Sequence, residues 1–140
     1  DYNLAKQIYE KSSIKYFNKI KLFPYVKKLL KKLSKHYILC LITSKSKNRT
    51  KKMIKKFNLK FNHTFCPEDK FKSKPNPQVV NYLKKKYNIK NHEIVIVGDS
   101  LADKKLAYRA SVKFIYASYG YYKMKSQFSL RNLKEIYKYL

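Results

Sequence analysis

Glycine, arginine and acidic residues are all scarce in this chain, and each shortage narrows its interpretation. Its two glycines, Gly98 and Gly120, leave no room for a flexible linker in 140 residues that are 44% hydrophobic. No apolar run approaches the roughly 20 residues that cross a bilayer, and no signal-peptide pattern is present. We therefore expect a soluble, cytoplasmic domain without a membrane partner. Cys40 and Cys66 lack metal-site spacing and are predicted to stay reduced.

The shortage of arginine decides how the net charge of +26 is interpreted. Of the 34 basic residues, only Arg49, Arg109 and Arg131 are arginines, and the lysines are spread along the whole chain. Arginine's planar fork fits phosphates and base edges best, and nucleic-acid sites usually gather their charge in one stripe. The abundant residue types have A/T-rich codons, so genome composition accounts for the charge. The composition thus argues against a nucleic-acid partner and leaves a positive field that attracts anionic substrates.

Helical spacing and short apolar runs alternate along the chain. Helices are expected over 1–19, after Pro24, over 47–57, from Pro77, over 101–110 and over 131–139. Strands are expected over 37–43, 63–66, 94–97 and 113–117. This alternation predicts an α/β fold: a three-layer, Rossmann-like parallel sheet with helices on both faces.

Polar residues gather where the predicted strands end. Residues 43–45 (Thr-Ser-Lys) follow the first strand, and residues 98–103 (Gly-Asp-Ser-Leu-Ala-Asp) follow the third. Between them, residues 74–77 (Lys-Pro-Asn-Pro) lead into a helix. Ligands of open parallel sheets bind beyond the carboxyl ends of the strands. The three segments are therefore predicted to face one crevice.

Asp99 and Asp103 lie four residues apart around one strand-to-helix turn, in a chain with only eight acidic residues. Two carboxylates this close repel each other unless a proton or a cation lies between them. A hard cation such as Mg²⁺ accepts carboxylate oxygens and keeps positions for water and phosphate. A turn aspartate followed by a helix-capping aspartate would give the same sequence, so both interpretations stand.

Lys74, Thr43 and Ser44 are the candidate phosphate ligands. The Lys74 ammonium suits a phosphoryl oxygen, and the prolines that follow it stiffen its loop. A hydroxyl at a strand end, followed by free N–H groups at a helix start, can hold an oxyanion. The alternative interpretations are that Lys74 is a solvated loop lysine and that Thr43 is an ordinary threonine at the end of a strand.

Taken together, the three segments resemble the second, third and fourth motifs of the haloacid dehalogenase superfamily. The resemblance is greatest to its phosphoglycolate phosphatase-like and β-phosphoglucomutase-like branch, and residues 115–121 look like that branch's last strand and Gly-Tyr turn. It implies that residues 20–140 form the α/β core and that residues 1–19 are the remnant of a helical cap.

The resemblance also implies a role for each site residue. Thr43 would hydrogen-bond the transferring phosphoryl group with help from the Ser44 backbone, and Lys74 would stabilise the charge on nucleophile and phosphate. Asp99 would bind Mg²⁺ directly, and Asp103 would bind it directly or through water. The catalytic residues would be Thr43, Lys74 and Asp99, and the substrate a small phosphorylated metabolite.

The family's first motif, an Asp-x-Asp-Gly-Thr-like sequence with the nucleophile and the general acid/base, has no match. Residues 1–3 (Asp-Tyr-Asn) follow no strand and lack the second acid. The chain alone is therefore expected to be inactive, and a longer parent carrying the motif is favoured over a degenerate relative. The alternative function is a basic, non-catalytic protein that binds RNA or an acidic partner. The substrate, phosphatase or mutase chemistry, and the oligomeric state are left open.

Overall fold

The computed structural model describes residues 2–140, except for the side chains of residues 2, 3, 6, 10, 13 and 14. The α-helices are α1 (Tyr2–Lys15), α2 (Val26–Leu33), α3 (Lys47–Phe57), α4 (Gln78–Tyr87) and α5 (Leu101–Arg109). The strands are β1 (Cys40–Ile42), β2 (His63–Phe65), β3 (Val95–Gly98), β4 (Lys113–Ala117) and β5 (Ser129–Leu130). Short 3₁₀ helices are η1 (Phe17–Lys19), η2 (Asn91–Glu93) and η3 (Leu133–Lys138). None of the described helices is both long and apolar enough to span a lipid bilayer.

Every strand pair is parallel, and strands alternate with helices as far as β4, which confirms the predicted fold class. β1 pairs with β2, and β3, β4 and β5 pair in that order. β5 was missed by the sequence analysis, and the predicted helix over 131–139 is a 3₁₀ run that begins only at Leu133. The predicted helix over 1–19 ends at Lys15 and is followed by η1; residue 1 lies outside the described residues.

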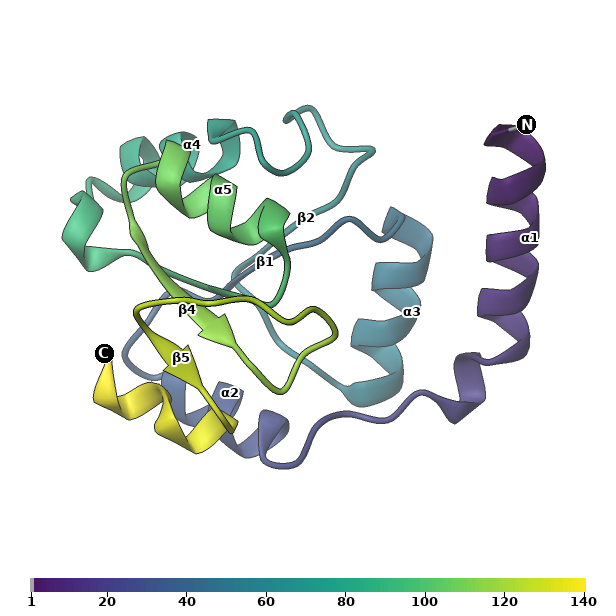
Figure 1. Ribbon diagram of the computed structural model, residues 1–140, viewed down its shortest axis with the longest axis horizontal. Helices are drawn as coiled ribbons and strands as arrows, with labels where there is room; N and C mark the ends of the chain where they lie inside the picture. The colour runs from purple at the N-terminus through teal and green to yellow at the C-terminus, as the bar shows by residue number, and fades with distance from the viewer. Residues whose placement is uncertain (1) are drawn as a thin grey trace.

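Two apolar clusters occupy the two faces of the sheet, because neighbouring side chains of a strand point in opposite directions. Ile94 and Ile96 join one cluster, which is formed mainly by α4 and α5. Val95 joins the other, which α2, η3, β4 and β5 supply. Figure 1 shows α4 and α5 above the strands, and α2 and the C-terminal segment that holds η3 below them. The molecule is therefore three-layered as predicted.

The sheet is interrupted between β1 and β3, which each pair on one side only. The labelled strands lie in the order β2, β1, β4 and β5 in Figure 1, so the interruption is in the middle of the sheet. Central parallel strands are normally buried on both faces. Ile115 of β4 is fully buried, but Val97 of β3 is 43% exposed. The interruption therefore leaves apolar strand surface uncovered.

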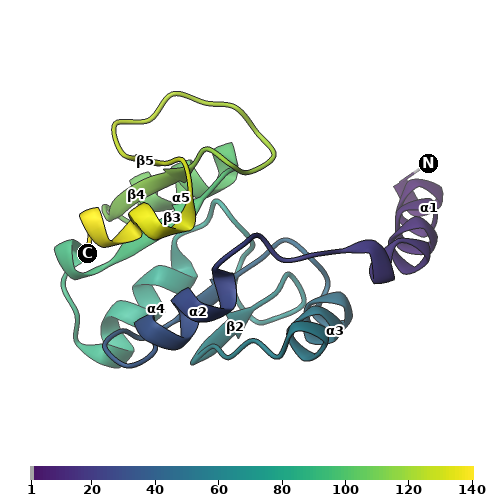
Figure 2. The same ribbon diagram turned by 90° about the horizontal axis from the view of Figure 1, so that it is seen from below.

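Helix α1 stands apart from the core in both views (Figures 1 and 2). Its contact with α3 places the Arg49 guanidinium 4.7 Å from the centre of the Tyr9 ring. In the segment that follows α1, the carbonyls of Phe17, Asn18 and Ile20 accept from the Lys56 ammonium at 2.7, 3.1 and 3.2 Å. One lysine of α3 thus holds the segment that connects α1 to the core.

Ser111 follows α5 in the left-handed region, with φ of 54°. A Cβ is unfavourable there, whereas glycine adopts this conformation freely. We expect Ser111→Gly to stabilise the protein by about 0.5–1 kcal/mol and to raise Tm by about 2–4 °C, measured by thermal unfolding. Ser111→Ala keeps the Cβ and is the matched control. Equal Tm values for the two variants would show that a Cβ at this position does not strain the backbone.

Candidate functional site

Thr43 and Ser44 lie just past the carboxyl end of β1. The Thr43 N–H donates to the Phe65 carbonyl (3.0 Å), so the pairing with β2 holds the residue in position. Thr43 Oγ1 accepts from the Lys45 N–H (3.1 Å), which leaves its own hydroxyl proton free to donate. The Ser44 N–H makes no hydrogen bond to the described residues. This strand end therefore offers two donors to an anion.

Lys74 reaches the same rim from the loop before α4. Lys74 and Thr43, 31 residues apart in the chain, line one small cavity of about 10 Å³ together with Ser73 and Asn76. Asn76 Oδ1 accepts from the Gln78 N–H (3.0 Å), but Pro77 is the N-cap of α4 and the helix begins at Gln78, so Asn76 closes a turn before the helix and does not cap it. This hydrogen bond holds the end of the loop that carries Lys74 against the start of α4.

Lys74 and Asp103 form a buried ion pair with 2.7 Å between Nζ and Oδ1, and each side chain is 12% exposed. Asp103 Oδ2 accepts from the Ser100 hydroxyl (2.6 Å) and N–H (3.1 Å). Burial alone would raise the pKa of Asp103, but the hydrogen bonds from Lys74 and Ser100 hold it below its ordinary value. Both oxygens of Asp103 are therefore engaged, and its contacts with Ser100 are those of a helix cap.

Asp99 keeps one carboxylate oxygen free. Its Oδ2 accepts from the Tyr121 N–H at 2.6 Å, and Oδ1 has no hydrogen-bond partner in the described part of the chain. Burial and the Asp99 carboxylate raise the pKa of the neighbouring Tyr119 hydroxyl. The turn after β4 thus holds the carboxylate that follows β3 through one of its two oxygens.

Each of the chain's two glycines lies against one of these two aspartates. A Cβ at Gly98 would lie 2.5 Å from Asp103 Cβ, and a Cβ at Gly120 would lie 2.3 Å from Asp99 Cβ. Both distances are too short for real atoms, so any side chain there would displace an aspartate. The sequence analysis recognised Gly120 only as part of a turn. Its contact with Asp99 cannot be predicted from the neighbouring residues, and only the rarity of glycine in this chain marks the position.

The start of α3 differs from the expected oxyanion cradle. The Lys47 N–H is not free, because both oxygens of Glu68 accept from it at 3.0 Å. Asp69 pairs with the Lys47 ammonium at 2.7 Å, and that contact is the main reason why its pKa is lowered. The sequence analysis missed both acids, since they reach the helix from a loop about 20 residues away. The first N–H of α3 is therefore not available to an anion.

The metal-binding chemistry at this rim is incomplete. Within the described residues, no group of three or more carboxylate, imidazole or thiol side chains is placed to hold an ion. The free oxygen of Asp99 suits Mg²⁺, which takes one or two carboxylates and fills its other positions with water and phosphate. The residues present fit such an ion, with further ligands to come from outside this set. Whether Thr43, Lys74, Asp99 and Asp103 act as a site stays a prediction.

Sequence comparison relates the chain to known hydrolases. Residues 1–117 match the profile of the haloacid dehalogenase-like hydrolases. Over 107 residues the chain is 31% identical to the phosphoglycolate phosphatase of Mannheimia succiniciproducens. The aligned region covers 74% of this chain and 48% of that protein. The chain thus spans about half the length of the curated relative that it matches.

Solved structures share the fold. A protein from Lactobacillus plantarum superposes with a TM-score of 0.85 at 22% identity, covering 99% of this chain and 70% of that one. A predicted phosphoglycolate phosphatase from Haemophilus somnus gives 0.77 at 27% identity, covering 84% and 56%. The hydrolase YfnB of Bacillus subtilis, solved with bound magnesium, gives 0.74 at 24% identity, covering 84% and 54%.

Proposed function

Because the chain belongs to the haloacid dehalogenase-like hydrolase family, we propose that it supplies the phosphate-binding part of a Mg²⁺-dependent phosphatase. The observation that carries this proposal is the convergence of three separate segments at one rim. Thr43 and Lys74 line one cavity, and Lys74 bonds Asp103 four residues after Asp99. The substrate we propose is a small phosphorylated metabolite, in line with the matched relative's activity.

In this proposal the chain's donors bind and orient the phosphoryl group. The Thr43 hydroxyl and the Ser44 N–H donate to its oxygens, and Lys74 places a positive charge beside them. Phosphoryl transfer depends on such positioning and on neutralising charge that spreads over the phosphoryl oxygens. Asp103 acts as a positioning residue, because its ion pair fixes the Lys74 ammonium.

Asp99 is the residue we propose to hold Mg²⁺ directly, through the oxygen that Tyr121 leaves free. Asp103 would contribute through water, since Lys74 and Ser100 already engage both of its oxygens. When bound, the ion neutralises charge on the phosphate and on the attacking group. The magnesium-bound relative from Bacillus subtilis supports this choice of metal.

The interruption between β1 and β3 is where we propose that the nucleophile enters. Neighbouring strands lie about 4.8 Å apart, so one parallel strand fits between two that are separated by a single gap. Its carboxyl end would lie between Thr43, which follows β1, and Asp99, which follows β3. An aspartate at that end would stand beside the phosphate donors and the metal ligand. We also propose that α1, which stands apart from the core, belongs to a helical cap.

The binding test uses inorganic phosphate and Mg²⁺, with affinities measured by isothermal titration calorimetry. We expect Thr43→Val to weaken phosphate binding about tenfold, since a hydrogen bond to a charged group contributes about 1.5–3 kcal/mol. Asp99→Asn should weaken Mg²⁺ binding by at least about tenfold. Glu93→Gln, in η2 at the other end of β3, is the control and should change neither affinity. Unchanged binding in both site variants would show that the site is assigned wrongly.

A further inference from the structure

Two exposed tyrosines follow the turn that holds Asp99. The Tyr121 side chain is 88% exposed and that of Tyr122 is 58% exposed. Their rings pack edge to face, with centroids 5.4 Å apart and planes at 73°. They lie in the long loop between β4 and β5, which projects from the core in Figure 2. A paired aromatic surface therefore borders the candidate site.

The backbone that carries these rings is held at several points. The Tyr121 N–H donates to Asp99, and the Tyr116 hydroxyl donates to the Tyr122 carbonyl at 2.6 Å. The Met124 N–H donates back to the Tyr116 hydroxyl at 3.3 Å, and Tyr116 itself is buried. The two rings are thus presented to solvent from a fixed turn. Aromatic side chains fixed in this way are suited to stacking with a flat ligand group.

Among the described residues, none of the other exposed tyrosines packs its ring against a second exposed tyrosine; they are Tyr9, Tyr16, Tyr37, Tyr108 and Tyr137. Tyr9 and Tyr16 lie beneath the cations of Arg49, Lys15 and Lys19. Tyr108 is 85% exposed but is a single ring near the end of α5, away from the strand ends. No described cation covers Tyr121 or Tyr122, and their turn contacts Asp99 directly.

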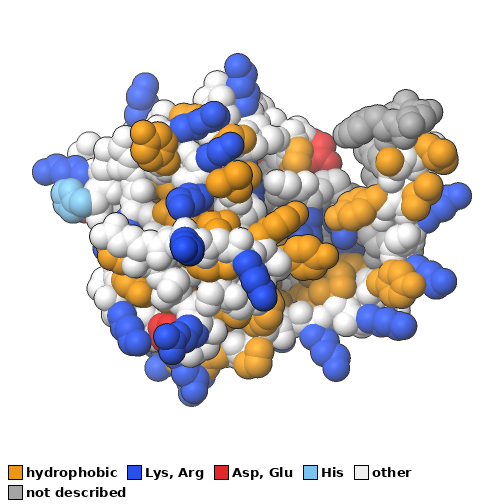
Figure 3. Space-filling model, in the orientation of Figure 1, with side chains coloured by type: hydrophobic (Ala, Val, Ile, Leu, Met, Phe, Trp, Pro, Cys, Tyr) orange, Lys and Arg blue, Asp and Glu red, His pale blue; other side chains and the backbone are white. Residues whose placement is uncertain are grey.

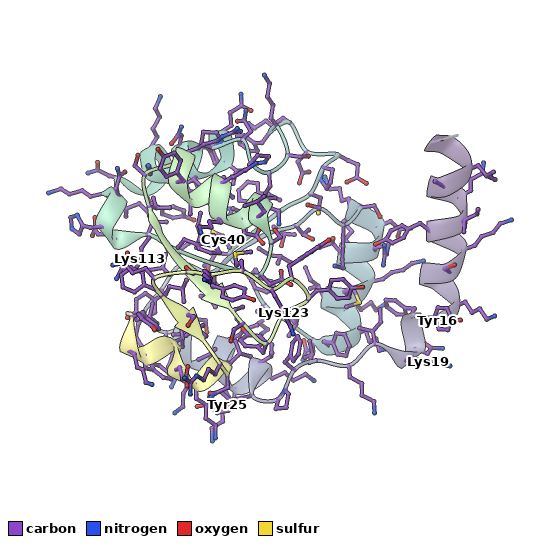
Figure 4. The ribbon with its side chains drawn as sticks, viewed as in Figure 1. Tyr16, Lys19, Tyr25, Cys40, Lys113 and Lys123 are labelled. Carbon is purple, nitrogen blue, oxygen red and sulfur yellow. The ribbon has the colours of Figure 1, made fainter. Side chains whose placement is uncertain are left out.

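We propose that Tyr121 and Tyr122 form a stacking surface for the base of a nucleoside monophosphate. This rests on the proposed function, because the phosphate is bound by the donors near Asp99 and the rest of the substrate extends over the rim. Stacking of a base on an aromatic side chain contributes about 1–3 kcal/mol by alanine substitution. Lys123 follows the pair on the same loop (Figure 4) and adds positive charge that attracts the anion. The pair then selects substrates by their aromatic group rather than by their phosphate.

The test measures binding to the whole chain by titration calorimetry with Mg²⁺ present. Adenosine monophosphate is compared with ribose 5-phosphate, which has the same phosphate and sugar but no base. We expect at least tenfold tighter binding of adenosine monophosphate. The double variant Tyr121→Leu/Tyr122→Leu should abolish this advantage and leave ribose 5-phosphate binding within twofold, since the Tyr121 N–H that holds Asp99 is kept. Tyr108→Leu, the matched control, should change neither affinity.

Equal affinities for the two ligands in the unmodified chain would overturn the stacking surface while the phosphate site stands. Loss of ribose 5-phosphate binding in the double variant would also overturn it, because the pair would then support the phosphate site. Adenosine binding as tight as adenosine monophosphate would show a base site unconnected with Asp99, against this proposal. No binding of either phosphate would overturn the proposed function and the stacking surface together.

Discussion

A peptide strand added between β1 and β3 is expected to bind this chain and to raise its Tm by several degrees. Val97 is 43% exposed on a strand whose sheet partner β4 is buried, so apolar surface is available to a new strand. Burying a valine-sized side chain contributes about 1.5–3 kcal/mol, and both strand edges would gain backbone hydrogen bonds.

The peptide should contain about six β-branched and apolar residues followed by an aspartate, which is the length of a usual strand. Binding is measured by thermal unfolding and by amide hydrogen exchange of Ile42 and Val97, whose N–H groups point away from β2 and β4. The matched control has proline in the middle of the same peptide, because proline removes a ladder donor. Protection should appear in β1 and β3. Protection confined to β2 or β5, the outer edges, would show that the interruption does not accept a strand.

Asp103→Asn is expected to lower the free energy of unfolding by about 3 kcal/mol at neutral pH. The variant leaves the Lys74 ammonium unpaired, and breaking a buried ion pair costs about 3–5 kcal/mol. We expect the lower end, because both side chains are 12% exposed. The double variant Lys74→Met/Asp103→Leu removes both charges and should recover part of the loss. Urea unfolding measures all three proteins.

The matched control for this ion pair is Asp69→Asn. Lys47 is 50% exposed in its pair with Asp69, so water screens that pair and Asp69→Asn should destabilise the chain much less than Asp103→Asn. The folded state lowers the pKa of Asp103, so its stabilisation is complete above the unfolded pKa of about 3.9 and is lost as pH falls through the lower folded pKa. The difference between the unmodified chain and Asp103→Asn should therefore shrink below about pH 4. If the two proteins had nearly equal free energies of unfolding at pH 7, or if their difference did not change with pH, the Lys74–Asp103 pair would not stabilise the fold.

The sequence analysis was most accurate where apolar spacing alone defines an element. The predicted helix over 47–57 and the strand over 113–117 have the bounds of α3 and β4. The strand predicted over 37–43 is reduced to Cys40–Ile42, and Ile38 is 43% exposed. Apolar character marks a residue that can be buried, but a strand also needs a neighbour to pair with. β1 has such a neighbour on one side only.

The end of the chain shows the same limit. β5 has only two residues, Ser129 and Leu130, and pairing with β4 defines it. So short a segment has no period that a sequence can display. The helical spacing of Leu133 and Ile136 was recognised, but it belongs to a 3₁₀ run. Packing of Ile136 against Leu29 and Leu130 holds this run in place.

Order and spacing along the chain were enough to place Thr43, Lys74, Asp99 and Asp103 beyond strand ends, because the alternation of strands and helices is encoded locally. The tertiary structure alone decided what each side chain contacts. Asp103 pairs with Lys74 29 residues away, and Asp99 accepts from Tyr121 22 residues away. Hydrogen bonds and ion pairs act over a few ångströms in space whatever the separation in sequence. No local pattern could therefore show that one carboxylate is fully engaged while the other keeps an oxygen free.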